Sequence, residues 1–283
     1  MISTNVSVVI PVYKPDKEVF KKLKEMLKKQ TVPVEIIEKW NNPEAVSMNV
    51  GIKEARGNSI IILAQDCIPE NEHWVEKMIA PLKDETVSAV VSDLLLPEFY
   101  WKKRPLLVRL FTINDLKLRK PVMNLSSCAY RKKDLEKIGY VDEKSSAIDL
   151  DFSIKISKIG KIVRANAVVY HVHPHYNYKK TLKAFYSYSK FNGIAVKNNG
   201  IKDSSHLQRV IRATPVLGFC AIYFRYPLKK YWYWLPLHSM ISATVEHTIN
   251  IIGFWNGFLC GEEEGGERNI EALKSKIAIE DFE

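Results

Sequence analysis

The sequence lacks several features that would place it in other protein classes. Its four cysteines have no paired spacing, so they indicate neither a disulfide framework nor a zinc knuckle. A reducing cytoplasm is therefore the expected compartment. The apolar opening run contains Pro11 and has neither a basic flank nor a cleavage site, so we expect no signal peptide.

The sequence also argues against two other protein classes, the dinucleotide-dependent oxidoreductases and the nucleic-acid-binding proteins. No G-x-G-x-x-G follows the first apolar run, which argues against a dinucleotide-dependent oxidoreductase. The 42 basic residues exceed the 32 acidic ones by ten, and this excess requires a partner such as nucleic acid, an anionic membrane or a phosphorylated substrate. Because the lysines are spread along predicted helices, and no reading helix, zinc finger or RNA-binding aromatic signature is present, we expect no nucleic-acid partner.

The chain instead alternates between strand-like and helix-like segments. Residues 6–13 form a near-continuous β-branched run, typical of a parallel strand that is buried on both faces. Residues 19–27 then place apolar side chains at helical spacing with lysines on the other face. Further strands are predicted at 34–40, 59–63 and 88–92, and further helices at 45–55 and 74–82. This order predicts an α/β fold with a doubly wound, mainly parallel sheet.

One acidic residue stands where such a sheet binds ligands. Asp66 follows the strand 59–63 almost directly, and Pro69 comes three residues later. Ligands of open α/β sheets bind outside the carboxyl ends of the strands. We therefore expect Asp66 to hold a ligand or a metal, with capping of the next turn as the alternative.

Three stretches around these elements carry a family resemblance: VSVVIPVY, NVGIKEARG and IIILAQDCIPENEHWVEKM. They resemble the nucleotide-binding half of family 2 glycosyltransferases with the GT-A fold, and most of all the rhamnosyltransferase-like branch. The resemblance continues in NLSSCAYRKKDLEKIGYVDE, AIDLDFSIKISKIGKIV and AVVYHVHPHYNY, and so covers roughly residues 5–195 in order. It implies a GT-A nucleotide-sugar-binding domain over residues 1–200 and a C-terminal helical region over residues 201–283.

The resemblance also implies a divalent cation, Mn²⁺ or Mg²⁺, that neutralises the charge of the departing diphosphate. Asp66 would be its carboxylate ligand. Gln65 stands where the family has a further acid, and it can offer a carbonyl oxygen to the donor or the metal. His171, His173 and His175 alternate after a predicted strand. The family uses a histidine here for the metal or the diphosphate, and we expect His171 first and His173 second.

A catalytic base is the next implication. An inverting transferase needs a carboxylate that takes a proton from the acceptor hydroxyl. In the matching string AIDLDF, Asp149 holds the position of that base, and Asp151 follows as a second candidate substrate-binding acid. The alternative for both residues is that they favour the start of a helix through its dipole.

The donor pocket is predicted from the same resemblance. Pro11 and Tyr13 would lie beside the nucleotide, and Asn49 would lie on the helix that approaches it. Glu38 is the nearest carboxylate to the end of the second strand, where the family reads the base or the ribose. Trp40 either stacks on the base or closes the sheet edge.

Two further segments differ in character from the predicted nucleotide-binding part: residues 94–123 and the chain after residue 200. Basic clusters at 101–104 and 117–120 either steer an anionic acceptor or form a solvated surface. The aromatic cluster 231–234 adjoins two lysines and precedes an amphipathic helix that reaches about Cys260. Glu246 and His247 make this helix costly to insert across a bilayer. We therefore expect interfacial membrane attachment, with a buried core helix and a membrane span as the alternatives.

Together these features predict an inverting, metal-dependent glycosyltransferase of hexosyltransferase type. It would move a sugar from a nucleotide-sugar donor to a lipid-linked or cell-surface glycan at the inner face of the cell membrane. The alternative is a catalytically inactive nucleotide-sugar-binding protein.

Overall fold

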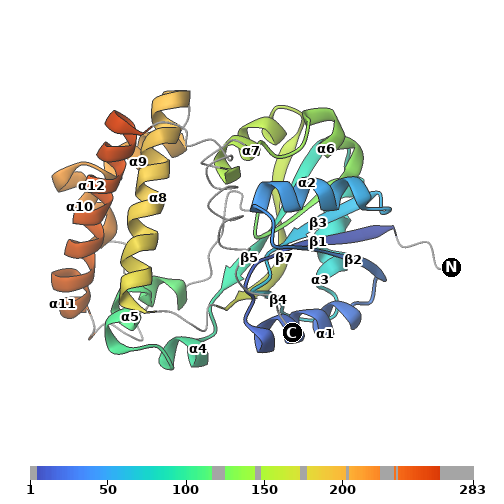
Figure 1. Cartoon of the computed structure of the whole chain (residues 1–283), viewed down its shortest axis with the longest axis horizontal. Helices are drawn as coiled ribbons and strands as arrows, with labels where there is room; N and C mark the ends of the chain where they lie inside the picture. The colour runs from blue at the N-terminus through green and yellow to red at the C-terminus, as the bar shows by residue number, and fades with distance from the viewer. Residues whose placement is uncertain are drawn as a thin grey trace. The chain divides into compact units, whose positions relative to one another are not determined.

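The computed structural model describes residues 5–116, 125–143, 148–172, 177–201, 204–223, 233 and 235–261. The chain divides into two compact units (Figure 1). The first, called the sheet unit, comprises residues 1–95 and 118–172 among others. The second, called the helical unit, comprises residues 96–117 and 173–264, so it begins before residue 200 and includes the long helix α8 (Tyr178–Asn199).

The sheet unit is built on a seven-stranded sheet with the order β2-β1-β3-β6-β5-β7-β4. The strand bounds are β1 Val6–Val12, β2 Val34–Trp40, β3 Ser59–Leu63, β4 Cys67–Pro69, β5 Val87–Leu95, β6 Ser127–Arg131 and β7 Lys161–His171. Strands β2, β1, β3, β5 and β7 run in one direction, whereas β6 and β4 run in the other. This confirms the predicted α/β fold with a mainly parallel sheet. The antiparallel β6 separates β3 from β5, an insertion that the alternating pattern did not predict.

Helices of the sheet unit pack on this sheet (Figure 1). Their bounds are α1 Lys17–Lys28, α2 Glu44–Glu54, α3 Trp74–Ile79, α6 Lys132–Ile138 and α7 Ile148–Ser157. Helix α1 begins where the Asp16 carboxylate accepts a hydrogen bond from the Val19 N–H at 2.9 Å. Helix α3 continues as the 3₁₀ turn η1 (Ala80–Lys83), because Pro81 has no N–H to extend the α-helical bonding.

One core joins the sheet to helices α2 and α7. Val9 and Ile62 from the strands pack with Met48 and Ile52 of α2, and Phe152 of α7 belongs to the same buried cluster. The sequence explains this arrangement, because the strands are apolar on both faces while α2 places its small and apolar residues toward them. The core therefore fixes the start of α2 beside the carboxyl ends of β1 and β3.

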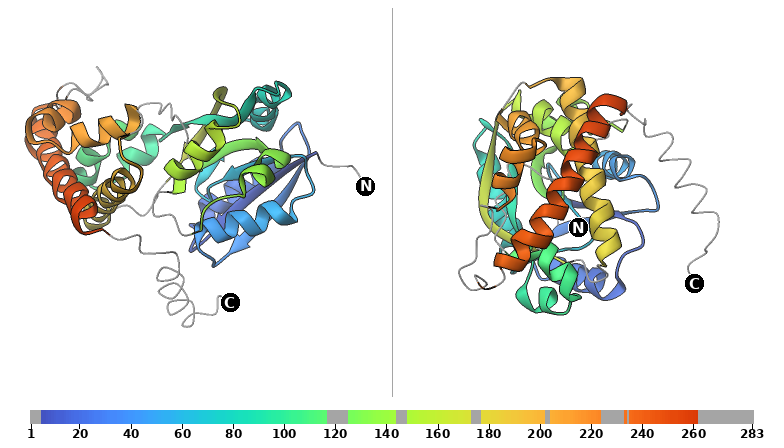
Figure 2. Two further views of the ribbon diagram at one scale, coloured as in Figure 1. Left: turned by 90° about the horizontal axis from the view of Figure 1, so that it is seen from above. Right: turned by 90° about the vertical axis from the view of Figure 1, so that its left-hand side faces the viewer.

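The helical unit contains longer and shorter helices (Figure 2). Their bounds are α4 Glu98–Lys102, α5 Leu106–Phe111, η2 Ile113–Leu116, α8 Tyr178–Asn199, α9 Ser204–Arg212, α10 Pro215–Tyr223, α11 Leu235–Leu237, the π-helical η4 His238–Ala243 and α12 Thr244–Cys260. Helices α8 and α12 cross closely, since a Cβ atom on Gly257 would lie 2.0 Å from the carbonyl oxygen of Lys190. Among the residues that the structure describes, no helix has the length and apolar character needed to cross a membrane.

Candidate functional site

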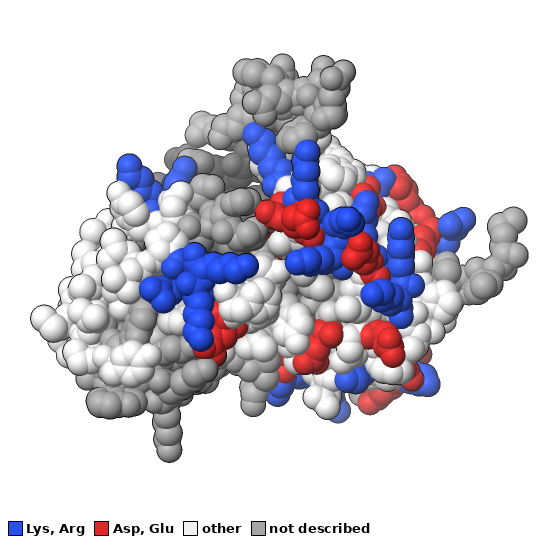
Figure 3. All heavy atoms as spheres, turned by 90° about the horizontal axis from the view of Figure 1, so that it is seen from below, with Lys and Arg blue, Asp and Glu red and all other residues white. Residues whose placement is uncertain are grey.

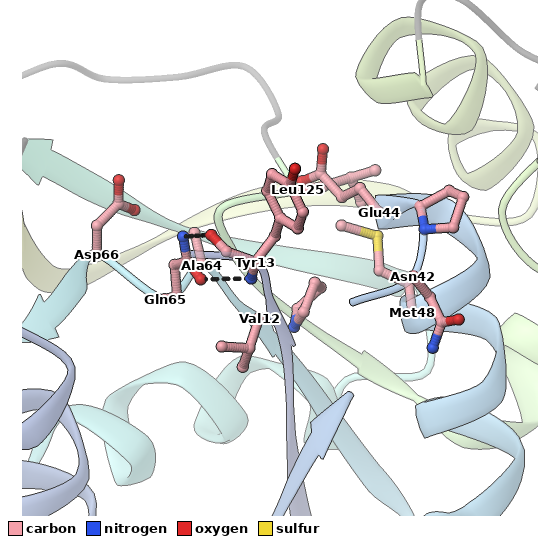
Figure 4. A pocket seen from close by; sticks show the side chains of 11 residues that line it. Val12, Tyr13, Asn42, Glu44, Met48, Ala64, Gln65, Asp66 and Leu125 are labelled. Atoms are coloured by element: carbon pink, nitrogen blue, oxygen red, sulfur yellow. Dashed lines mark hydrogen bonds between the residues drawn. The ribbon is translucent and has the colours of Figure 1, made fainter. Parts of the chain in front are cut away.

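A cavity of about 330 Å³ opens at the carboxyl ends of β1 and β3 (Figure 4). Three segments and one further residue line it: Pro11, Val12 and Tyr13 from β1 and its end, Asn42, Pro43, Glu44 and Met48 around the start of α2, Ala64, Gln65 and Asp66 after β3, and Leu125. None of these described lining residues is a lysine or arginine. Four residues that the sequence analysis selected, namely Pro11, Tyr13, Gln65 and Asp66, therefore meet in one cavity.

Gln65 joins the ends of the two strands that form the cavity floor. Its side-chain carbonyl accepts the Tyr13 N–H at 2.8 Å, and its side-chain N–H donates to the Tyr13 carbonyl at 2.9 Å (Figure 4). The amide therefore pairs with both backbone groups of Tyr13. This pairing holds Tyr13 at the cavity, and it places the Gln65 carbonyl oxygen against Tyr13.

Asp66 lies beside His171 at the edge of the cavity. The Asp66 Oδ1 and His171 Nε2 atoms are 3.4 Å apart, and each side chain keeps about a quarter of its surface exposed, 24% and 23%. Strand pairing produces this contact, because Cys67 of β4 is directly opposite His171 of β7 and the Val172 N–H donates to the Asp66 carbonyl at 2.8 Å. Asp66 and His171 thus come from segments more than 100 residues apart in the chain.

These two side chains, together with Cys67, form a group whose ligand atoms all lie within 4.8 Å of one another. Cys67 is fully buried, and burial, with the charges of Asp66 and Cys128, raises the pKa of its thiol well above the usual value. The thiol therefore stays protonated, and the accessible donors are a carboxylate oxygen and an imidazole nitrogen. Residue His173 lies outside the described residues.

Glu44 adds an acid to the cavity that the sequence analysis did not select. It is the first residue of α2 and lines the cavity while keeping solvent-exposed surface. Desolvation by the surrounding protein, with the charges of Asp149 and Asp66, raises the pKa of its carboxyl to about 7. Glu44 lines the same cavity as Asp66, and like charges so close together disfavour its charged form although the residue keeps exposed surface.

Asp149 lies in the first turn of α7, next to the cavity wall. Its Oδ1 atom accepts a hydrogen bond from the N–H of Leu125, a cavity-lining residue, at 3.1 Å. The Asp149 side chain is exposed, whereas Asp151, two residues further along α7, is half-buried. The charge of Asp149 contributes, after desolvation, to the raised pKa of the Glu44 carboxyl. The structure therefore brings Asp149, Glu44 and Asp66 to one acidic site.

Asn49 lies elsewhere on α2 and does not line the cavity. Its side-chain N–H groups donate to the Val141 carbonyl at 2.9 Å and to Glu143 Oε1 at 2.8 Å. Its carbonyl oxygen accepts the Val141 N–H at 3.0 Å. Asn49 is buried, so its contacts in the structure fix the loop after α6.

Glu38 and Trp40 also lie outside the cavity lining. The Glu38 carboxylate accepts from the Trp40 indole N–H at 3.1 Å and forms an ion pair with Lys24 at 3.2 Å. The Trp40 ring packs edge-to-face against Phe20, with 5.6 Å between the ring centroids. These contacts attach the end of β2 to helix α1.

With this geometry in view, comparison with known proteins identifies the domain. Residues 16–139 match the model of glycosyl transferase family 2. The matched segment covers 124 of the 283 residues, so the similarity to this family concerns that part of the chain. The predicted family resemblance is thereby confirmed, while the rhamnosyltransferase-like branch stays a prediction. A search of curated proteins gave no match.

Solved structures support the same fold for the family 2 domain and its surroundings. The chain is similar to the mannosyltransferase PcManGT from Pyrobaculum calidifontis, solved in complex with GDP-Man and Mn²⁺. The two share 13% identity and a TM-score of 0.63, over 91% of this chain and 88% of that chain. The fold is therefore of the GT-A glycosyltransferase type, as predicted.

Two more distant similarities have TM-scores below 0.5. GalNAc-T7, solved with UDP, GalNAc and Mn²⁺, has a TM-score of 0.47 and 14% identity over 74% of this chain and 54% of that chain. S. aureus TarS 1–349 has a TM-score of 0.42 and 13% identity over 89% of this chain and 90% of that chain. The fold assignment rests on the mannosyltransferase alone.

Proposed function

We propose that this protein is an inverting glycosyltransferase that moves a hexosyl group from a nucleotide-sugar donor to a hydroxyl group of a glycan acceptor. The observation that carries this proposal is the meeting of Asp66 and His171, 3.4 Å apart, beside a cavity at the carboxyl ends of β1 and β3. A glycosyltransferase family match over the same domain supports it.

A divalent cation fits the Asp66 and His171 pair. Two ligand atoms that each lie about 2.1 Å from one cation are about 3.0–3.4 Å apart for ligand–metal–ligand angles of 90–109°. The observed separation of 3.4 Å falls at the upper end of this range. A carboxylate oxygen and an imidazole nitrogen also suit Mn²⁺ or Mg²⁺ better than a protonated thiol does. When bound, the cation would supply positive charge toward the diphosphate leaving group.

The residues of the cavity would perform the remaining tasks. The cavity volume of about 330 Å³ lies within the range of small-molecule sites. Tyr13, held by Gln65, would form the wall beside the donor. Asp149, exposed at the start of α7, would accept the proton of the attacking hydroxyl as that oxygen bonds to the anomeric carbon and the nucleoside diphosphate leaves.

The acceptor that we propose is a lipid-linked or cell-surface glycan, reached from the cytoplasmic face of the cell membrane. The basic helical unit, described below, supports a membrane-bound acceptor.

The alternative, a catalytically inactive nucleotide-sugar binder, is favoured by one observation. Gln65 stands where the family has an acid, and its carbonyl oxygen is used by Tyr13.

Calorimetry with a panel of nucleoside diphosphates and nucleotide sugars, with and without Mn²⁺, tests the proposal. We expect one nucleotide to bind, and to bind more tightly with Mn²⁺. Asp66→Asn should remove the metal-dependent gain, because it deletes one cation ligand. Glu25→Gln is the matched control, since it removes one exposed charge from helix α1. Metal-enhanced binding that survives in Asp66→Asn would exclude Asp66 from the site.

A further inference from the structure

Exposed apolar side chains are concentrated in the helical unit. Within the described residues, twenty large apolar side chains are exposed, and eighteen of these belong to the helical unit. Trp40 and Val50 are the two in the sheet unit. In soluble domains, exposed apolar side chains usually occur singly. A contiguous group of them marks a surface that contacts a membrane or a protein partner.

The net charge is concentrated in the same unit. Residues 96–117 and 173–264 contain 16 of the 42 basic residues and only 7 of the 32 acidic ones. They therefore carry a net charge of +9 out of the total of +10. Figure 3 shows acidic and basic side chains interspersed over the part of the surface that belongs to the sheet unit. The rest of the chain is thus close to neutral.

The helical stretch from α11 through η4 to α12 turns its apolar row outward. Leu237 and Met240 are 51% and 76% exposed, and Ile252 and Leu259 are 56% and 67% exposed. Its buried side consists of small and polar residues together with Phe254. Ser242, His247, Gly253 and Gly257 are buried, and Asn250 forms a hydrogen bond with Ser189 of α8. Thr244, Thr248 and Asn256 are exposed beside the apolar row, but none of the exposed residues described in this stretch is charged, unlike the outer face of a typical water-facing helix.

A patch at one end of the unit combines both features. It consists of Phe99, Lys102, Lys103, Leu106, Leu107 and Met240. Phe99, Leu106 and Leu107 are 56%, 55% and 47% exposed. Helix α4 carries Phe99 and Lys102, Lys103 follows directly after it, and α5 carries Leu106 and Leu107. Helix α5 contacts η4, which carries Met240. Figure 1 places α4, α5 and α11 at the same end of the helical unit.

We propose that this patch and the outer row of α12 bind the surface of an anionic phospholipid membrane without spanning it. Aliphatic side chains beside lysines suit the boundary between acyl chains and acidic headgroups. A second copy would bring two units of net charge +9 together, which repulsion opposes. Nucleic acid would pair its phosphates with the lysines, but this would leave the exposed aliphatic row without an apolar contact.

This inference does not depend on the transfer reaction. Of the aromatic cluster that the sequence analysis assigned to the membrane, residues 231, 232 and 234 lie outside the described residues, and Tyr233 is 56% exposed. Of the predicted basic cluster 101–104, Trp101 and Arg104 are buried, so the exposed cations are Lys103 and Lys102, the latter paired with Glu98 at 2.8 Å.

Co-sedimentation of the full chain with vesicles tests the proposal. We expect binding to vesicles of phosphatidylglycerol and phosphatidylcholine, weaker binding at high salt, and little binding to phosphatidylcholine alone. The variant Lys102→Glu with Lys103→Glu should lose about 30-fold or more in partition coefficient, at about 1 kcal/mol for each lysine removed from an anionic surface. The matched control changes Lys21 and Lys22 to glutamate, an exposed pair on α1 that gives the same change in net charge.

A second variant tests the apolar contribution. Leu107→Gln with Met240→Gln should also weaken binding at high salt, while Val50→Gln in the sheet unit should not. Equal loss in the α1 control and in the patch variant would overturn the proposed patch. A wild-type protein that ignores anionic vesicles, and instead forms dimers in sedimentation equilibrium or binds RNA, would overturn the membrane as the partner. Donor binding in the calorimeter should stay unchanged in every variant, so this failure is distinguishable from failure of the proposed transferase.

Discussion

Asn49→Ala should destabilise the sheet unit strongly, although Asn49 lies outside the cavity. The side chain is 5% exposed and holds both backbone groups of Val141, itself 3% exposed. Truncation leaves one buried N–H and one buried carbonyl without this partner, at about 1–3 kcal/mol each. The lost contact with exposed Glu143 adds little, because that carboxylate can turn to water. We therefore expect a loss of about 2–6 kcal/mol.

Urea denaturation followed by circular dichroism measures this loss. Amide hydrogen exchange supplies a local readout, because the Val141 N–H should lose its protection while the β1 amides keep theirs. Asn58→Ala is the control, since Asn58 is exposed and the change should stay within about 0.5 kcal/mol. An Asn49→Ala variant that loses less than about 1 kcal/mol, or that keeps the protection of Val141, would refute the role of Asn49 in fixing this loop.

The remaining predictions concern the charge of the cavity and the packing of the helical unit. Because Glu44 ionises at about pH 7, Mn²⁺ affinity should rise as the pH increases through about 7, and Glu44→Gln should flatten this rise in Mn²⁺ titrations. Because the pKa of Glu44 is raised in the folded state, its ionisation lowers folding stability as the pH rises from about 4.5 to about 7. Thermal denaturation should therefore show a smaller loss of stability over this pH range in Glu44→Gln than in the wild type. Gly257→Ala would place a methyl group 2.0 Å from the Lys190 carbonyl oxygen and should cost about 2 kcal/mol or more, whereas exposed Asn256→Ala should be neutral.

Much of the fold could be predicted from the sequence because its signals are local. The β-branched run of β1 and the helical spacing of α1 each depend on neighbouring residues alone. The place of β6 between β3 and β5 could not be predicted, because its pairing partners lie about 35–70 residues away in the chain. The outward apolar row of α12 was equally undetermined, since the spacing of apolar residues defines a face but not what that face contacts.

The residues of the candidate site could likewise be predicted only in part. The strand-end position of Asp66 led to the cavity, because the carboxyl ends of parallel strands meet at one edge. Glu44 was not selected, since an acid in the first turn of a helix is common and its approach to Asp66 and Asp149 depends on how α2 and α7 pack. Its sequence signal was present, however, as an acid directly after Pro43 and beyond the end of the second strand.

Nucleoside diphosphate release by the wild type and by two acid variants tests the proposed transfer reaction most directly. With the donor and acceptor saturating, Asp149→Asn should lower turnover by about 10² or more, the usual scale for losing a positioned base. The donor dissociation constant should remain close to that of the wild type, and half-buried Asp151→Asn should be much milder. A wild-type protein that binds the donor but releases no diphosphate with any acceptor, or an Asp149→Asn variant that turns over normally, would contradict this account and favour a nucleotide-sugar binder.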